Sequence, residues 1–147
     1  MTVAVGVSLD GARIPLSRDR VARIARRVLA GEGARDAMLS ITFVGRPAIR
    51  ALNRRHLRRS GATDVIAFGF RRAGRRGPVV GDVYIAPDVA RASARANGVT
   101  VREELVRLVV HGVLHVLGYD HPENEKRTTS PMWRRQERLV ARLGRQP

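Results

Sequence analysis

The sequence contains no cysteine among its 147 residues. This absence excludes disulfide bonds, a disulfide-linked partner, zinc sites built from thiolates and catalysis by a cysteine nucleophile. Histidine, aspartate and glutamate remain as the side chains that could ligate a metal ion. The chain has 4 His and 13 Asp+Glu, so the candidates for metal chemistry are few.

Long hydrophobic segments are missing as well. No apolar run in the sequence approaches the ~20 residues that a membrane-spanning helix needs. Residues 1–17 also lack the basic region and the long apolar core of a secretion signal. We therefore expect a cytoplasmic protein that has no membrane partner.

Acidic residues are outnumbered and lysine is scarce. The chain has 28 Lys+Arg against 13 Asp+Glu, which gives a net charge of +15, and Lys126 is its one lysine. A charge of this size favours a polyanionic partner, such as nucleic acid or an acidic membrane surface. The preference for arginine is explained equally well by phosphate binding and by a genome rich in G and C.

The composition is that of one ordinary globular domain. Hydrophobic residues make up 44% and charged residues 28% of the chain, close to the averages for such domains. No repeat or low-complexity linker divides residues 1–147, so we predict a single domain. The expected order of elements indicates an α+β fold, with a small mixed β-sheet packed against helices.

Hydrophobic periodicity and capping signals place the individual elements. Strands are expected near the N-terminus and over residues 38–44, 65–70 and 79–86. Helices are expected over residues 18–30, 45–56, 87–97, 101–117 and 132–144. Gly31 is expected to end the first helix. Residues 71–78 are predicted to form a hairpin-like loop, and residues 121–129 a second loop.

The strongest chemical signal is the segment HGVLHVLGYDH, which begins at His111. His111 and His115 lie four positions apart on a predicted helix, so their imidazoles share one face and could bind one ion. Gly118 can adopt the left-handed conformation that ends a helix and folds His121 back toward them. The segment therefore predicts a zinc site, with one Zn²⁺ ion per chain, at the end of a central helix.

The spacing of these histidines equals the ligand spacing of the metzincin peptidases, in which three histidines leave one zinc position open. An open position favours catalysis. A closed structural site remains an alternative if Asp120 or Glu123 supplies a fourth ligand. Asp120 could instead orient an imidazole or only pack in the turn. The remaining histidine, His56, is expected to be an ordinary surface or packing residue.

Position 112 bears on the type of reaction. It is glycine, whereas zinc peptidases with this histidine spacing place a glutamate there as the general base. Glycine would also leave backbone near the metal uncovered and so provide space for a bulky substrate. Together with the net charge of +15, this favours a phosphodiester over a peptide bond as the substrate.

With these motifs in view, the sequence resembles the YbeY family of bacterial endoribonucleases over about Leu39 to Tyr119. The resemblance rests on the histidine segment and on matching segments in the family's order and spacing, which are Leu52-Asn53, Thr63 to Phe68, Gly81 to Ile85 and Glu104-Leu105. It implies zinc-dependent, single-strand-specific cleavage of RNA. It also implies a role in maturing the 3′ end of the small-subunit rRNA and in ribosome quality control. The implied partners are therefore single-stranded RNA, rRNA and the ribosomal small subunit.

The resemblance also implies roles for individual residues. His111, His115 and His121 would be the zinc ligands, and Thr63-Asp64 would open the strand beside the site. Many family members carry an arginine where this chain has Leu57. We expect Arg58 and Arg59 to replace it as catalytic residues. The substrate-binding residues are expected in the following loop, namely Arg71, Arg72, Arg75 and Arg76.

Non-catalytic interpretations of the same residues are also open. Each of these arginines could be a solvated surface residue, and Thr63 and Asp64 could simply form a turn. Ala67, Gly69 and Pro122 depart from the common family pattern. A non-catalytic ribosome-binding or RNA-binding module with structural zinc is the main alternative function, and a zinc peptidase is the other.

Overall fold

The computed structural model describes residues 2–57, 63–70, 72, 74, 76–121 and 125–144. Its strands are β1 (Val3–Asp10), β2 (Ala37–Val44), β3 (Val65–Gly69) and β4 (Val79–Ile85). Its α-helices are α1 (Arg18–Gly31), α2 (Arg46–Leu52), α3 (Pro87–Asn97), α4 (Val101–Val116) and α5 (Pro131–Leu143). A π-helical turn, η1 (Asn53–Leu57), follows α2, and a 3-10 helix, η2 (Glu125–Thr129), precedes α5.

The strands form one mixed sheet in the order β1-β2-β4-β3. β1 pairs parallel to β2, and β2 pairs parallel to β4. β3 is antiparallel to β4, with Val65 opposite Ile85. The predicted α+β fold with a small mixed sheet is therefore confirmed. In the described ranges, no helix is long and apolar enough to cross a membrane.

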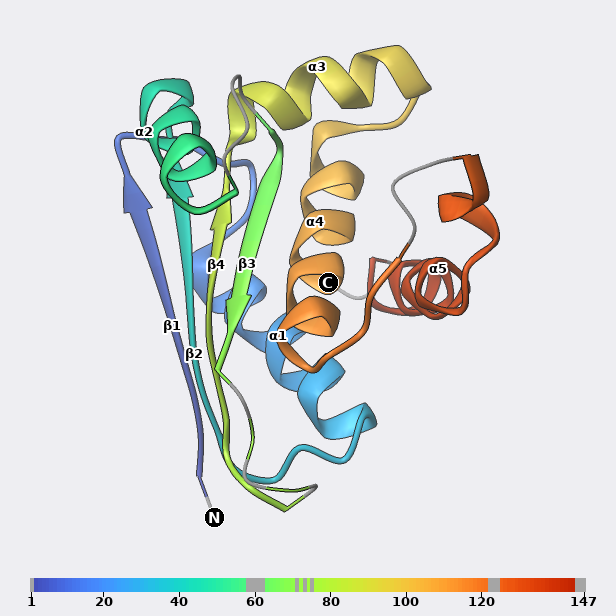
Figure 1. Cartoon of the computed structure of the whole chain (residues 1–147). Coiled ribbons are helices and arrows are strands. Elements are labelled where there is room, and N and C mark those ends of the chain that lie inside the picture. The colour runs from blue at the N-terminus through green and yellow to red at the C-terminus, as the bar shows by residue number, and fades with distance from the viewer. Residues whose placement is uncertain are drawn as a thin grey trace.

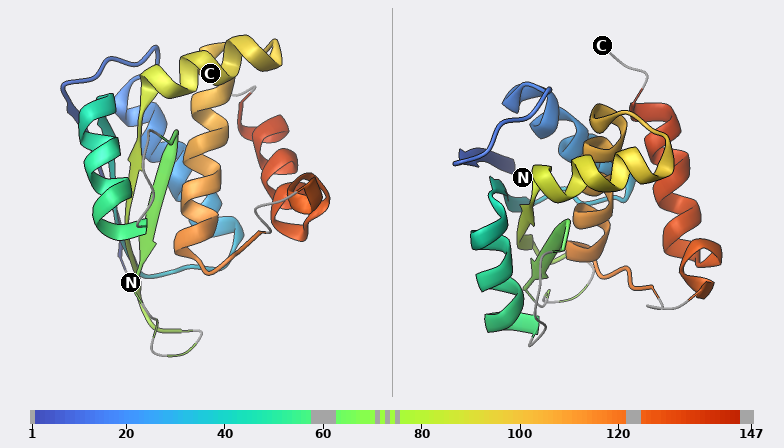
Figure 2. Two further views of the ribbon diagram at one scale, coloured as in Figure 1. Left: turned by 45° about the horizontal axis from the view of Figure 1, so that its top comes forward. Right: turned by 90° about the horizontal axis from the view of Figure 1, so that it is seen from above.

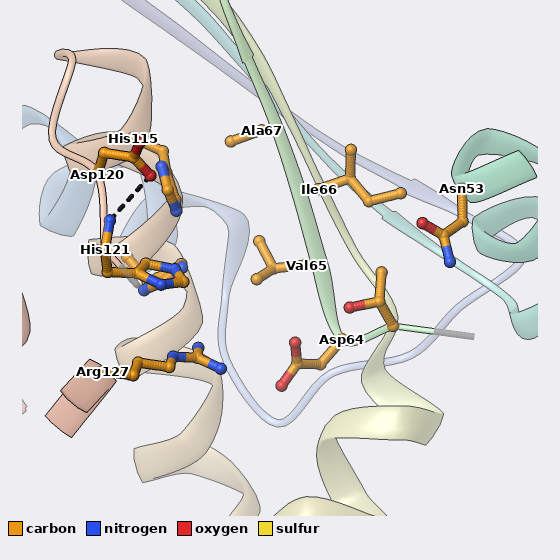
Figure 3. A pocket seen from close by; sticks show the side chains of 11 residues that line it. Asn53, Asp64, Val65, Ile66, Ala67, His115, Asp120, His121 and Arg127 are labelled. Atoms are coloured by element: carbon orange, nitrogen blue, oxygen red, sulfur yellow. Dashed lines mark hydrogen bonds between the residues drawn. The ribbon is translucent and has the colours of Figure 1, made fainter. Parts of the chain in front are cut away.

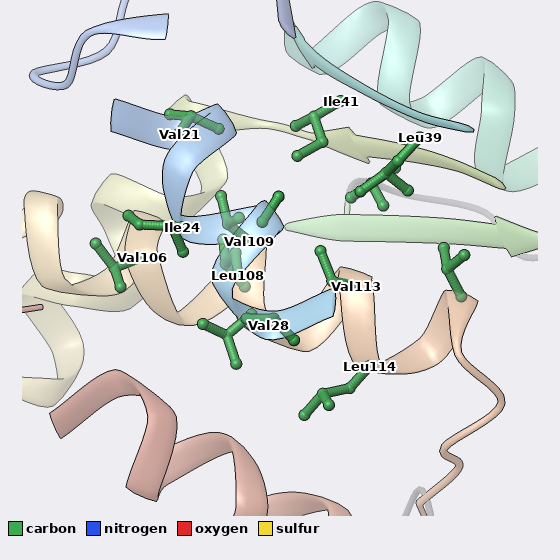
Figure 4. Close-up of a cluster of buried hydrophobic side chains, with 14 of the residues drawn as sticks. Val21, Ile24, Val28, Leu39, Ile41, Val106, Leu108, Val109, Val113 and Leu114 are labelled. Atoms are coloured by element: carbon green, nitrogen blue, oxygen red, sulfur yellow. The ribbon is translucent and has the colours of Figure 1, made fainter. Parts of the chain in front are cut away.

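Helices cover the two faces of the sheet unequally (Figures 1 and 2). α1 and α4 pack side by side on one face, and α5 packs on the outer side of α4. α2 lies on the opposite face, where Ile49 is buried with Ile66 of β3. The larger core thus lies between the sheet, α1 and α4, where apolar side chains of all three meet (Figure 4).

The helices begin where capping residues predict. The hydroxyls of Ser17, Thr100 and Ser130 each accept a backbone N–H three residues onward, at 3.0, 3.0 and 3.2 Å. These bonds satisfy donors that the first helical turn leaves without a partner. The N-termini of α1, α4 and α5 are therefore specified locally by sequence.

Three local expectations differ from the structure. Gly31 lies within α1, and Gly33 is the residue that takes the left-handed conformation after it, with φ 78°. The Ala34 N–H then donates to the Leu29 carbonyl at 2.9 Å, which closes the turn two residues later than expected. The helix expected over residues 45–56 divides into α2 and η1, and η2 occupies part of the expected second loop.

α4 approaches the sheet so closely that glycine is required at the contact. A Cβ on Gly112 would lie 2.5 Å from Cγ1 of Val83 in β4, and one on Gly81 would lie 2.5 Å from Cγ1 of Val116. A Cβ on Gly69 would lie 2.8 Å from the Val116 carbonyl oxygen. All three separations are shorter than van der Waals contact, so the depth at which α4 sits depends on these glycines.

Gly112→Ala is expected to lower the free energy of unfolding by about 1–3 kcal/mol, because Val83 is β-branched and cannot rotate away. In a Val83→Ala background the same change should cost at least about 1 kcal/mol less, since the clashing methyl is gone. Urea unfolding of the four proteins in the cycle measures this coupling. Gly6→Ala is the control, because a Cβ there meets nothing within 4 Å. If the losses of unfolding free energy caused by Gly112→Ala and Val83→Ala were simply additive in the double variant, this explanation of the contact would be wrong.

Candidate metal centre and active site

The last two turns of α4 carry His111 and His115, and the chain reverses directly after them. Gly118 has φ 104°, a conformation that L side chains rarely adopt. The Gly118 N–H donates to the His115 carbonyl at 2.9 Å, and the Tyr119 N–H donates to the Leu114 carbonyl at 3.0 Å. This pair of bonds is a Schellman motif. The expected reversal at Gly118 is confirmed, and it returns His121 to the end of α4.

The reversed segment is held by side chains from two other helices. The Tyr119 hydroxyl donates to Glu32 at the end of α1, at 3.1 Å. Arg135 of α5 donates from Nε to the other oxygen of the same carboxylate, at 2.7 Å. Glu32 thus joins α1, α5 and the turn before His121, so the third histidine does not depend on Gly118 alone for its position.

The three histidines converge. One ring nitrogen from each of His111, His115 and His121 lies within 4.8 Å of the others, and the ring centroids are 4.7, 5.1 and 5.0 Å apart. Nitrogens around a tetrahedral zinc ion lie roughly 3.4 Å apart, given Zn–N bonds of about 2.0–2.1 Å. Small side-chain movements reach that distance, so the group could hold a metal ion at the end of α4.

Burial prepares these rings to act as ligands. It lowers the pKa of His111 to about 3, because desolvation outweighs the hydrogen bond that the ring makes with Gln136. The pKa of His115 is also lowered, chiefly by burial and further by His121 nearby. Both imidazoles are therefore neutral at pH 7, which is the form that ligates metals.

A buried glutamine sets which nitrogen of His111 faces the cavity. Gln136 of α5 is 1% exposed, and its Oε1 lies 2.6 Å from Nδ1 of His111. Because an amide oxygen can only accept, Nδ1 carries the proton and Nε2 keeps its lone pair for a metal. The Gln136 amide donates in turn to Glu137 at 3.0 Å. Arg107 of α4 binds both oxygens of Glu137, at 2.9 and 3.0 Å.

No fourth protein ligand joins the group within the described ranges. The carboxylate of Asp120 accepts the backbone N–H of His121 at 2.8 Å (Figure 3), so it shapes the turn. Glu123, the other residue considered for a closed site, lies outside the described residues. The arrangement of the described side chains is that of an open site with three ligands.

The histidines line a cavity of about 450 Å³ beside β3. Thr63 and Asp64 line it where β3 begins, as expected, and Asn53 of η1 lines its far side (Figure 3). Burial raises the pKa of Asp64, and the positive charge of Arg127 opposes that rise. Figure 3 shows the side chains of Asp64 and Arg127 pointing toward one another across the cavity.

Of the six expected arginines, Arg72 and Arg76 lie in the described part of the chain. Arg58, Arg59, Arg71 and Arg75 lie outside the described residues. Arg72 and Arg76 are described, but neither lines the cavity. Nε of Arg72 donates to the Gly77 carbonyl within the β3–β4 connection, at 3.2 Å. Their roles in catalysis and RNA binding stay predictions.

The reason proposed above for Gly112 is wrong in one respect. The position faces Val83 in the sheet, so the absent side chain provides room for β4 and none for a substrate. A glutamate at this position would point into the core. The lack of the peptidase base therefore follows from the packing of α4.

Two residues of the site were missed from sequence. Gln136 shares a buried face of α5 with Met132 and Val140, four positions before and after it, so a polar residue at an apolar position was the available signal. Arg127 stands in η2, and nothing in its neighbours distinguishes it from the other arginines. His56, which was expected to be an ordinary surface or packing residue, is exposed and packs its ring edge-on against Phe68, with centroids 4.8 Å apart.

Comparison with known proteins gives consistent matches. The family model described as Endoribonuclease YbeY matches residues 10–144. A Geobacter metallireducens protein named endoribonuclease YbeY is 33% identical over 137 residues, which cover 91% of each chain. One from Geobacillus kaustophilus is 35% identical over 136 residues, covering 86% of each. An Anaeromyxobacter relative of the same name is 43% identical over 110 residues, and the match spans 57% of its length.

A solved structure agrees in fold. The solution structure of a Thermotoga maritima protein superimposes with a TM-score of 0.65 at 24% identity, covering 95% of this chain and 89% of that one. This likeness shows a shared fold across nearly the whole chain. Since the family model spans most of the sequence and full-length relatives exceed 30% identity, the chain belongs to the endoribonuclease YbeY family.

Proposed function

We propose that this protein is a zinc-dependent endoribonuclease that cleaves single-stranded RNA. In this proposal His111, His115 and His121 bind one Zn²⁺ ion per chain. The substrate is rRNA of the ribosomal small subunit, whose 3′ end the enzyme matures in the cytoplasm, with a further role in ribosome quality control. The observation that carries the proposal is the convergence of three histidines in a cavity of a YbeY-family chain.

The chain's own residues prepare the site for this reaction. When bound by three neutral imidazoles, zinc keeps its full charge and supplies Lewis acidity for water or for a phosphoryl oxygen. Gln136 holds the His111 ring in the tautomer that presents Nε2 to the cavity. The open side of the site carries polar and charged groups from the residues just before β3, Thr63 and Asp64, and from η2, Arg127.

The geometry of the site does not favour the two alternative functions, a module with structural zinc and a zinc peptidase. A structural zinc site would need a fourth ligand, and Asp120 is engaged with the backbone of its own turn. A zinc peptidase would need a general base, and Gly112 faces the sheet. The net charge of +15 also favours a polyanionic substrate over a peptide. Arg58 and Arg59 are proposed to act in catalysis, and Arg71, Arg72, Arg75 and Arg76 to bind the RNA through this charge.

His121→Ala is expected to abolish stoichiometric zinc binding and to reduce cleavage of a single-stranded rRNA fragment by at least about 100-fold, because two imidazoles bind zinc weakly. His111→Ala should do the same. Zinc content by mass spectrometry and cleavage of a labelled fragment measure both effects.

His56→Ala is the matched control, since it removes the one histidine outside the group, and it should retain both zinc and activity. Thermal unfolding shows whether each variant is folded. Equal cleavage by the wild type and by folded His121→Ala would refute the proposal, because it would point to a contaminating nuclease. The product ends identify the nucleophile: a 2′,3′-cyclic phosphate reports attack by the 2′-hydroxyl, and a 5′-phosphate reports attack by water.

Gln136→Met is expected to weaken zinc binding by about 10–100-fold, because the isosteric thioether cannot hold the Nδ1 proton of His111. Gln136→Glu keeps an acceptor at the same place and should restore most of the affinity. Competition with a chromophoric chelator measures the dissociation constants. Met132→Leu, on the same buried face of α5, is the packing control. Unchanged zinc affinity in Gln136→Met would show that the glutamine only fills space.

A further inference from the structure

Two cavities meet at the histidine group. The first, beside β3, is the one described above. The second, of about 440 Å³, is lined by side chains of α3, α4, η2 and α5. Asp64, His111 and Arg127 line both cavities. The two cavities therefore adjoin, and these three residues form the junction between them.

Arg127 is held at this junction by its backbone. Its carbonyl accepts the Ser130 N–H at 3.3 Å and the Ser130 hydroxyl at 2.8 Å, and Ser130 is also the N-cap of α5. The side chain extends from η2 into the cavity toward Asp64 (Figure 3). It is exposed, and in the part of the chain that the structure describes it forms no ion pair within 4 Å. The anchored backbone and the solvent-facing guanidinium suit a residue that meets a ligand.

The positive charge at the junction of the two cavities favours the binding of an anion. Arg127 lines both cavities together with His111, and it shares the first cavity with His115 as well. A divalent cation on the histidines would add to this charge, and Asp64 is the acidic side chain at the junction. The single carboxylate of Asp64 would not balance a guanidinium and a divalent cation together, so a further anion between them would be stabilised. A phosphodiester has the charge and the paired oxygens that a guanidinium binds.

We propose that Arg127 contacts the scissile phosphate of the RNA, and that the two cavities hold the nucleotides on either side of that phosphate. This assignment rests on the proposed function. Arg127 keeps its proton throughout, and it neutralises charge on the non-bridging oxygens as the pentacovalent phosphorane forms.

The chemistry of the second cavity suits a nucleobase better than a phosphate. Trp133, the one tryptophan of the chain, lines it together with Ser93 and Asn97. An indole ring can stack on any base, and hydroxyl and amide groups can bind its edge. Glu104 and Glu137 also line the cavity beside Arg107, and their carboxylates would repel a second phosphate. The RNA therefore enters the second cavity with a base pointing inward and with its phosphate at Arg127.

Arg127→Gln is expected to lower kcat/KM for a single-stranded RNA by on the order of 100-fold, the usual cost of removing one transition-state donor. Arg127→Lys should recover part of the loss, because it restores the charge without the two parallel donors. Arg134→Gln, an equal change of charge at an exposed position of α5, should stay within about threefold of the wild type. Zinc content should be equal in all four proteins.

The single tryptophan reports the second cavity directly. In the His121→Ala variant, which should not cleave, a single-stranded RNA oligonucleotide is expected to quench Trp133 fluorescence. Adding Arg127→Gln should weaken that binding by about tenfold, since one charge-assisted contact is lost. Binding by fluorescence anisotropy of a labelled RNA provides the reference measurement.

The outcomes separate the two proposals. A wild type that cleaves no RNA would overturn the proposed function, with or without quenching. A wild type that cleaves, with Arg127→Gln equal to Arg134→Gln, would overturn the role of Arg127 alone. RNA that binds by anisotropy but leaves Trp133 fluorescence unchanged would overturn the place given to the nucleobase. A loss of zinc or folding in Arg127→Gln but not in Arg127→Lys would assign the arginine a structural role.

Discussion

The close seating of α4 on the sheet is the constraint on which the rest of the molecule depends. α4 is the central helix of the core, and its final turns also carry two of the three converging histidines. Because Gly81 and Gly112 remove the side chains that would separate helix and sheet, the backbone of α4 approaches β4 closely. Its position along the sheet is thereby restricted to one arrangement, since protein interiors admit few voids and little overlap. Because His111 and His115 belong to α4, their positions relative to the sheet are fixed as well. Thr63 and Asp64 lie opposite them because β3, which follows these two residues, pairs with β4.

The metal centre is then assembled by layers outside the sheet. α4 supplies two rings, the reversal at Gly118 returns the third, and α5 supplies Gln136 from behind. Arg107 and Glu137 join α4 to α5 by two short hydrogen bonds next to that glutamine, so the packing of the two helices and the orientation of His111 are coupled. Glu32 plays the corresponding part on the other side, where it receives Tyr119 and Arg135 together. The ligand geometry thus depends on α1, α4, α5 and the turn at Gly118 together.

Sequence reasoning succeeded where one residue's local chemistry determined the outcome. The caps at Ser17, Thr100 and Ser130 and the left-handed turn at Gly118 follow from intrinsic backbone preferences, so they were predictable from a few neighbouring residues. The histidine spacing was predictable because the period of a helix is fixed. Gln136 was missed because its role arises from a contact with His111, 25 positions away in sequence. Arg127 was missed because its role depends on the cavity that it shares with Asp64 and the histidines. No local pattern encodes either arrangement. The reading of Gly112 failed for the same reason. From sequence, a glycine that admits a substrate cannot be distinguished from one that admits a neighbouring strand.

The electrostatics of the site connect the unusual charge of the chain to one place in the fold. Exposed arginines occur in all five α-helices, so the net charge of +15 by itself attracts polyanions without orienting them. Arg127 differs from the other described arginines because it faces the histidines, and the carboxylates of the second cavity set the limit of the positive region beside it. A strand of RNA drawn to the surface by the general charge would find one position where a phosphate meets a guanidinium and a metal together. On the next position toward α5, aromatic and acidic side chains favour a base over a phosphate. A phosphate would thus lie at the positive junction of the two cavities, and the neighbouring base would lie in the second cavity beside Trp133.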